Sequence, residues 1–229
     1  MKDPRLFRRQ QGQSLPEFLI VIPLFLFLVL LLFQLVLIYR AKTILDYAAL
    51  EAARRGAVSQ VDMDEMRSGL AYGLAPLYAT DSGAGGVAMA FGRARTDIIL
   101  NANIEVISPT RAAWDQFNEH QYDGRRALPN DNLSYRPREE RGTGTSVQDA
   151  NVLKIKVDYD FPLIVPFVDL VLRGDSRYVR PEGFFDDARV DMKHPLLGAG
   201  RHYRIPLQSH AVVRLQSPVY QRDRLAAGP

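Results

Sequence analysis

Residues 18–39 read FLIVIPLFLFLVLLLFQLVLIY, and this run decides the fold. The run contains no charged residue, and Gln34 is its one strongly polar side chain. Since an α-helix rises about 1.5 Å per residue, a helix over this run spans roughly 33 Å, enough to cross a hydrocarbon core of about 30 Å. The sequence therefore predicts a transmembrane helix over residues 18–39.

A single carboxylate, Glu17, borders this predicted span. A carboxylate at the edge of a membrane helix is costly and is a functional hypothesis by default. If the chain is cut after Gly12, the new α-amino group of Gln13 places a positive charge four residues from Glu17. In an array of such helices, Glu17 of one subunit would neutralise the Gln13 amine of its neighbour. The alternative is that Glu17 lies solvated among the lipid headgroups.

A basic stretch, residues 1–12, precedes the apolar run. Its cationic side chains are Lys2, Arg5, Arg8 and Arg9. A secretory signal peptide is cut after its apolar core, which is then lost, whereas a cut after Gly12 leaves the apolar helix in the mature protein. We therefore expect residues 1–12 to be a leader peptide and the span to be kept.

Helical periodicity continues beyond the span. Small and apolar residues recur at the i, i+3, i+4 and i+7 spacing: Ala41, Ile44, Leu45, Ala48 and Ala52. This pattern predicts one helix from about Ser14 to Ala57, apolar in its first half and amphipathic in its second, with Gly56 as its end signal.

At these residues the sequence resembles a known family. A basic leader, Gly12, Glu17 five residues later, aromatic Phe18 and then an apolar helix resemble the type IVb prepilin processing site. The longer string RRQQGQSLPEF, followed by the apolar run and YRAKTILDYAALEAARRGA, is similar to the TadE-like pseudopilins of the tight adherence (Tad/Flp) pilus system. Further along, NVLKIKVDYDFPLIVP and IPLQSHAVVRLQSPV look like that family's paired strands.

The resemblance implies that a prepilin peptidase cuts after Gly12 and that Gln13 becomes the new N-terminus. It also implies that Glu17, beside Phe18, is the assembly carboxylate. The implied partners are the prepilin peptidase, the major pilin, other minor pilins or pseudopilins, an inner-membrane pilus assembly platform and membrane lipid.

The charge distribution indicates topology rather than nucleic-acid binding. The whole chain is formally +3, and the leader alone is also +3, so the remainder is neutral. A neutral remainder offers no general electrostatic footprint for nucleic acid. Basic residues flanking a span favour the cytoplasmic side, so we expect a cytoplasmic N-terminus and a periplasmic C-terminal domain in the bacterial inner membrane.

Residues 59–229 are expected to form one small α+β domain that carries helices and a short antiparallel sheet. The predicted elements are a helix over Val61–Tyr78 capped by Asp62, a helix over 87–100, a strand over 103–108, a loop-rich insertion over 109–149, a strand over 152–161 and its antiparallel partner between Ile205 and Val219. The apolar segment 162–172 favours a helix packed on the sheet, with shallow insertion into the membrane surface as the alternative.

The sequence predicts no catalytic site, metal or cofactor. Gly-Thr-Gly-Thr-Ser at 142–146 lacks the Lys-Ser/Thr ending of a phosphate loop, which favours a polar loop. Two further groups lack the ligand spacing of known metal sites: His194, His202 and His210, and the acidic residues Asp175, Asp186, Asp187 and Asp191. The favoured interpretations are surface or core histidines and a solvated turn.

The sequence thus predicts a non-enzymatic minor pilin or pseudopilin that packs through its apolar helix. The alternative is an uncleaved single-pass anchor that presents a periplasmic binding domain to a secretion or envelope complex. The two differ at Gly12 and Glu17, since an anchor gains nothing from cleavage and does not need the carboxylate. The chain contains no cysteine, so disulfide and thiolate chemistry are excluded.

Overall fold

The computed structural model describes residues 14–79, 83–138, 144–165, 168 and 204–228. The leader, Gly12 and Gln13 lie outside these ranges, as do His194, His202 and the acidic residues between 175 and 191. Most of the predicted helix over 162–172 also lies outside them.

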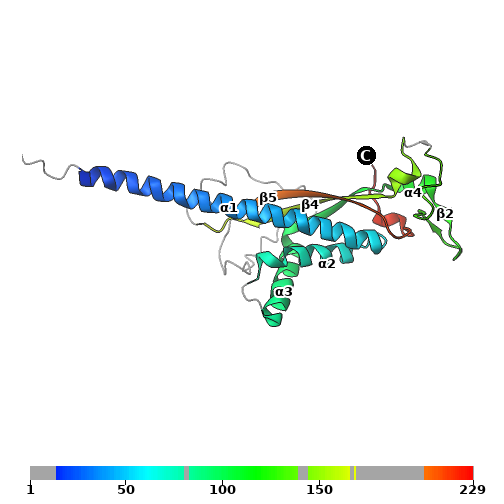
Figure 1. Ribbon diagram of the computed structural model, residues 1–229, viewed down its shortest axis with the longest axis horizontal. Coiled ribbons are helices and arrows are strands. Elements are labelled where there is room, and N and C mark those ends of the chain that lie inside the picture. The colour runs from blue at the N-terminus through cyan, green and yellow to red at the C-terminus, as the bar shows by residue number, and fades with distance from the viewer. Residues whose placement is uncertain (1–13, 80–82, 139–143, 166–167, 169–203, 229) are drawn as a thin grey trace, which may run out of the picture.

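The long N-terminal helix, α1 (Ser14–Val58), is one unbroken element of 45 residues. It projects from the domain with its first half and packs into the domain with its second (Figure 1). This confirms the predicted single helix, which ends one residue later than expected.

Gly56 is not the end signal of α1. The chain reverses at Gln60 and Val61, which have left-handed φ values of 60° and 59°. The Val61 N–H donates to the Gly56 carbonyl at 2.8 Å, the bond that closes a Schellman-type helix end. Gly56 instead permits close packing, because a Cβ atom there would lie 2.7 Å from the Met66 side chain.

Two helices follow α1. In α2 (Met63–Leu74), the Asp62 carboxylate accepts hydrogen bonds from the backbone N–H groups of Asp64 and Glu65 at 3.0 and 3.2 Å, which confirms the predicted cap. Pro76 then tightens the chain into the 3₁₀ turn η1 (Ala75–Leu77). The next helix, α3 (Ala84–Asn101), begins three residues earlier than predicted.

The sheet has three antiparallel strands in the order β1 (Ala102–Ser108), β4 (Val152–Pro162) and β5 (Arg204–Arg214). The central strand β4 alternates as predicted, and it buries Leu153, Ile155, Val157, Tyr159 and Phe161. The predicted antiparallel pairing is confirmed, although β5 ends at Arg214, short of Val219.

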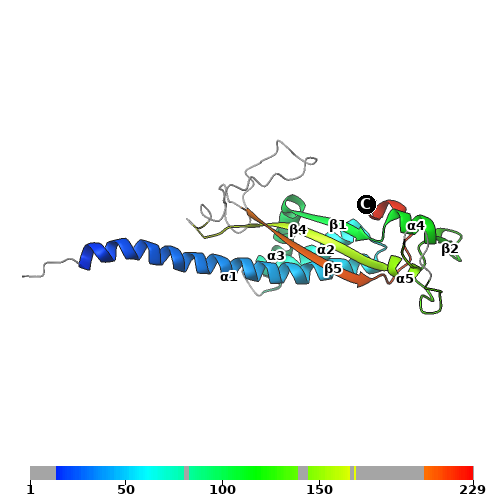
Figure 2. The same ribbon diagram turned by 90° about the horizontal axis from the view of Figure 1, so that it is seen from above.

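The second half of α1 supplies the centre of the core. Its side chains Ala41, Leu45, Ala48, Ala49, Ala52, Ala53 and Ala57 are fully buried. Helix α2 packs against them, and β4 and β5 run alongside α1 (Figure 2). The domain is therefore built around the same helix that carries the apolar run.

The segment 109–149, expected to be a loop-rich insertion, carries short elements and contributes to the core. These are α4 (Arg111–Phe117), β2 (Glu119–His120), β3 (Arg126–Ala127) and α5 (Val147–Ala150), with η2 (Arg222–Arg224) beside them near the C-terminus. Leu128 and Leu133 are buried, and Trp114 Nε1 donates to the Val219 carbonyl at 2.9 Å. Each element is too short to impose a recognisable period on the sequence.

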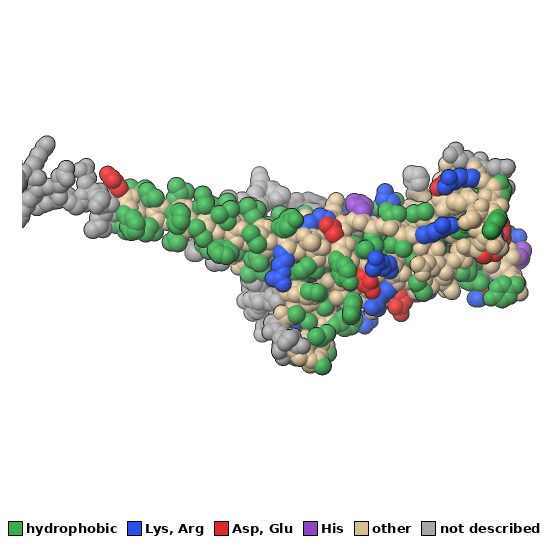
Figure 3. Space-filling model, viewed as in Figure 1, with side chains coloured by type: hydrophobic (Ala, Val, Ile, Leu, Met, Phe, Trp, Pro, Cys, Tyr) green, Lys and Arg blue, Asp and Glu red, His purple; other side chains and the backbone are tan. Residues whose placement is uncertain are grey.

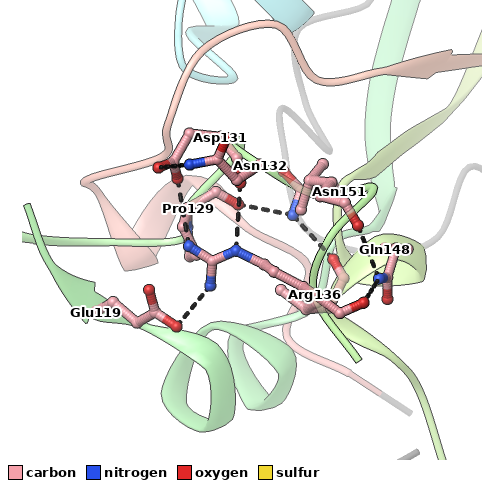
Figure 4. A network of polar contacts seen from close by, with 9 residues as sticks. Glu119, Pro129, Asp131, Asn132, Arg136, Gln148 and Asn151 are labelled. Atoms are coloured by element: carbon pink, nitrogen blue, oxygen red, sulfur yellow. Dashed lines mark hydrogen bonds and ion pairs between the residues drawn. The ribbon is translucent and has the colours of Figure 1, made fainter. Parts of the chain in front are cut away.

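Polar contacts join the loops at this end of the domain, the distal end (Figure 4). Arg136 Nη1 donates to Glu119 Oε1 at 2.6 Å, and its Nη2 donates to Asp131 Oδ1 at 3.3 Å. Gln148 Nε2 donates to the carbonyls of Leu133 and Arg136, both at 2.9 Å. The two Gln148 bonds satisfy backbone carbonyls of the loop, and the two Arg136 bonds join side chains.

Candidate functional site

The first half of α1, residues 17–39, is the largest exposed apolar surface of the described chain, and we call it the apolar half. Its exposed large side chains are Phe18, Leu19, Ile20, Val21, Leu24, Phe25, Leu26, Leu28, Leu32, Phe33, Leu35, Val36 and Tyr39. The most apolar 18-residue window has a mean hydropathy of 3.1, and only 6% of it is buried. Apolar side chains cover the projecting helix in Figure 3.

A helix that is apolar all round belongs either in a core or in a membrane. Because the apolar half is exposed, it is not a core helix. It also differs from a removable signal peptide, because Ala41 to Ala57 of the same helix fill the centre of the domain. The surface therefore suits lipid or the apolar helices of neighbouring subunits.

Glu17 lies in the first turn of α1, where a negative charge complements the helix dipole. The side chains of Glu17 and Phe18 are both exposed. None of the ion pairs formed within the described residues includes Glu17. Gly12 and Gln13, the other predicted site residues, lie outside the described residues, so the structure places only Glu17 and Phe18 of the four.

Charged side chains tie α1 to the sheet one turn beyond the apolar half. Lys42 pairs with Asp46 and also donates to the Gln208 carbonyl of β5 at 2.6 Å. Ser209 Oγ donates to Asp46 Oδ1 at 2.7 Å. Partial burial acts to raise the pKa of Asp46, but the bonds from Lys42 and Ser209 outweigh it and hold the pKa below its ordinary value. An ion pair thus lies at the boundary between the apolar half of α1 and the domain.

Gln34, the one strongly polar residue of the stretch 18–39, is fully buried. Its Oε1 accepts the backbone N–H groups of Ile164 and Val165 at 3.2 and 2.9 Å. Sequence reasoning gave Gln34 no role, although a lone polar residue in an apolar helix is a signal for a buried partner.

A second buried polar group lies inside the domain. The hydroxyls of Tyr78 and Tyr159 both donate to the carboxylate of Asp97, and Asn101 Nδ2 donates to its other oxygen at 2.7 Å. Arg204 Nη2 lies 3.4 Å from the same oxygen. Burial, with the nearby carboxylate, raises the pKa of both tyrosines well above the ordinary value. This cluster joins α3 to the sheet and was not foreseen from the sequence.

The remaining candidates have structural explanations where the structure describes them. Ser146, in the Gly-Thr-Gly-Thr-Ser stretch, caps α5 in a capping box with Asp149, so this is a loop leading into a helix. His210 is exposed on β5. Among the described residues, no three His, Cys, Asp or Glu side chains gather as a metal site would require.

An exposed apolar helix that continues into the core of an α+β domain defines a pilin-like, membrane-anchored, single-pass protein. Comparison of the sequence with known families agrees with this class. The family described as TadE-like protein matches residues 12–54, so this segment is similar to TadE-like proteins, in agreement with the resemblance seen in the sequence. The match associates the segment with the Tad pilus system. No curated protein and no solved structure gives a significant match.

Proposed function

We propose that this protein is a minor pilin or pseudopilin of a Tad pilus. A prepilin peptidase cuts it after Gly12, and the apolar half then packs among the helices of the major pilin and other minor pilins. The observation that carries this proposal is the exposed apolar half, which continues as the central helix of the domain. The protein is an assembly subunit, and no step of this function requires catalysis.

Transfer from lipid to a filament would exchange one apolar environment for another. Water exclusion therefore contributes little to the free energy of assembly. Close packing and polar contacts instead select the register of each helix against its neighbours. Glu17 at the start of the apolar half is suited to that selection, because its exposed carboxylate is free to face a neighbouring subunit. After cleavage, the Gln13 amine lies four residues away, about 6 Å along a helix. Pairing between subunits cancels both charges at the edge of the apolar layer.

The membrane topology follows from the same arrangement. The basic leader holds the N-terminus in the cytoplasm, and the inner-membrane assembly platform meets the protein from that side. The domain that begins at Lys42 and Asp46 then lies in the periplasm.

The first test is the intact mass and N-terminal sequence of the membrane-extracted protein, made with and without its cognate prepilin peptidase. We expect a terminus at Gln13 only when the peptidase is present, and a Gly12→Val variant should stay uncut. A Met1 terminus under both conditions would instead support the uncleaved anchor.

The second test replaces Glu17 with alanine. Because the apolar half is unchanged, Glu17→Ala should insert into the membrane normally but be lost from sheared pili. The matched control is Glu65→Ala, which removes a carboxylate from the first turn of α2, away from the apolar half. Normal incorporation of Glu17→Ala into pili would contradict the charge-pairing mechanism.

A further inference from the structure

The end of β4 lies against the apolar half of α1. Both views show this end of the strand reaching back along α1 toward its projecting half (Figures 1 and 2). The contact is made by the backbone N–H groups of Ile164 and Val165, which both donate to Gln34 Oε1. We call Leu163–Val165 the β4 tip.

The depth of this contact follows from the exposure of the neighbouring helix positions. Phe33, Leu35 and Val36 are 62%, 47% and 64% exposed, while Gln34 between them is fully buried. Charged side chains begin only at Arg40, six residues or about 9 Å further along the helix. Large apolar side chains therefore surround α1 on its other faces at the level where the β4 tip touches it.

A membrane that ended before Gln34 fits the helix less well. It would leave a span of Glu17–Phe33, at the lower limit of about 17 residues for a transmembrane helix. It would also place the exposed side chains of Leu35, Val36 and Tyr39 in water. The bilayer is therefore expected to include the level of Gln34.

Most of the backbone N–H groups of the β4 tip are satisfied as hydrocarbon demands, although Gln34 Nε2 is buried with no hydrogen-bond partner among the described residues. Within a bilayer, backbone N–H groups need protein acceptors, since water is absent. The stretch 162–166 reads PLIVP, and proline has no N–H group, so only three N–H groups are present. Gln34 accepts two of these three. The side chains are apolar, with Leu163 and Val165 buried and Ile164 partly exposed.

We propose that the β4 tip inserts into the periplasmic leaflet beside α1, with Gln34 as its polar anchor and lipid acyl chains against Ile164. The inference rests on the proposed function only in that it requires the apolar half to span the bilayer. It gives the protein a second membrane contact, so entry into a filament must withdraw the β4 tip from lipid as well as α1.

The absence of cysteine permits a direct test with single-cysteine variants of the full chain. Ile164→Cys, labelled with an environment-sensitive fluorophore in phosphatidylcholine vesicles, should emit at short wavelength. Lipids that carry a quencher on the acyl chain should quench it, and aqueous iodide should not. Val36→Cys, on the exposed face of the apolar half, provides the lipid reference. Val212→Cys, 57% exposed on β5, provides the aqueous reference.

The two references separate the possible failures. If the probe at position 36 lies in lipid and the probe at position 164 lies in water, the inference is overturned and the membrane span stands. If Val36 also reports water, the span itself is wrong, and the proposed function fails with it.

Gln34→Leu tests the anchor. Because the two N–H groups then lose their acceptor, the Ile164 probe should shift toward the aqueous reference, while a Val36 probe in the same background should stay in lipid. Unchanged quenching at Ile164 would show that Gln34 does not hold the β4 tip. A Gln34→Asn variant keeps an amide acceptor without adding a charge and should retain more lipid quenching than Gln34→Leu.

Discussion

The two halves of α1 share one backbone and differ in the size of their apolar side chains. The apolar half is built from Leu, Phe, Val and Ile, which stay exposed. The second half places alanine at six of its seven fully buried hydrophobic positions. Both halves are apolar on the relevant surface, so hydrophobicity alone does not distinguish them. Side-chain size distinguishes them. Small residues allow another backbone to approach closely, whereas large residues suit lipid chains or the helices of changing neighbours.

The close approach is visible where α1 meets α2. A Cβ atom on Gly73 would lie 2.4 Å from Ala48 Cα, and one on Gly69 would lie 3.0 Å from Ala52 Cα. Nothing in the apolar half contacts a described helix in this way. The second half of α1 is thus fitted to one partner, whereas the apolar half is not.

The sharpest test of this contrast is a pair of leucine truncations. Leu45→Ala, at a fully buried position, should lower the free energy of unfolding by roughly 2–5 kcal/mol, because it leaves a cavity in the core. Leu24→Ala, at a position 68% exposed, should change it by less than about 0.5 kcal/mol. Urea unfolding of the detergent-solubilised full chain measures both. Equal losses would break the distinction between the halves.

Alkaline pH should loosen the domain and leave the apolar half unchanged. The pKa values of Tyr78 and Tyr159 are raised in the folded state, mainly by burial, so their stabilisation is complete below pH 10 and is lost as pH rises above it. For two such tyrosines the loss reaches roughly 3 kcal/mol by pH 11.

Urea unfolding between pH 9 and 11 measures this loss. Tyr78→Phe or Tyr159→Phe should roughly halve the slope, at the cost of lower stability at pH 8. No side chain from Phe18 to Ile38 titrates, so helical circular dichroism of the apolar half should persist. If neither substitution changes the dependence of stability on pH, groups other than these tyrosines cause the loss of stability at alkaline pH.

Two glycine substitutions test the fit between α1 and α2. Gly73→Ala should destabilise by about 1–3 kcal/mol, because the new methyl group meets the backbone at Ala48. Gly92→Ala in α3, where a Cβ atom meets nothing within 4 Å, should stabilise by about 0.5–1 kcal/mol through helix propensity. Thermal unfolding in detergent compares them, and the same sign for both would contradict the packing described here.

The smallest expected effect lies at the boundary between the halves. The pKa of Asp46 is lowered, so its ion pair with Lys42 contributes stability above the ordinary Asp pKa of 3.8 and loses it as pH falls further. Because the pair is about half exposed, the contribution is slight. Asp46→Asn should reduce the decrease in stability between pH 5 and pH 3. An unchanged decrease would show that other carboxylates cause it.

The sequence predicted elements that have a long local pattern. The apolar run, the alternation in β4 and the Asp62 cap are each set by neighbours in the chain, so they were found within a residue or a few of their true bounds. Gln34 with Ile164 and Val165 was not found, because the partners are about 130 residues apart and no periodicity connects them. The Tyr78, Asp97 and Tyr159 cluster was missed for the same reason.

The continuity of α1 has a consequence for how the domain faces its surroundings. With no break between the apolar half and the core, each residue added or removed between Tyr39 and Leu45 would swing the domain about 100° around the helix axis and shift it about 1.5 Å. The azimuth of the distal end around a membrane normal or a filament axis is therefore set by residue count in this short stretch, together with the contact of the β4 tip with Gln34. Neighbouring subunits that pack against the apolar half at a fixed angle therefore also determine the direction in which the distal end points.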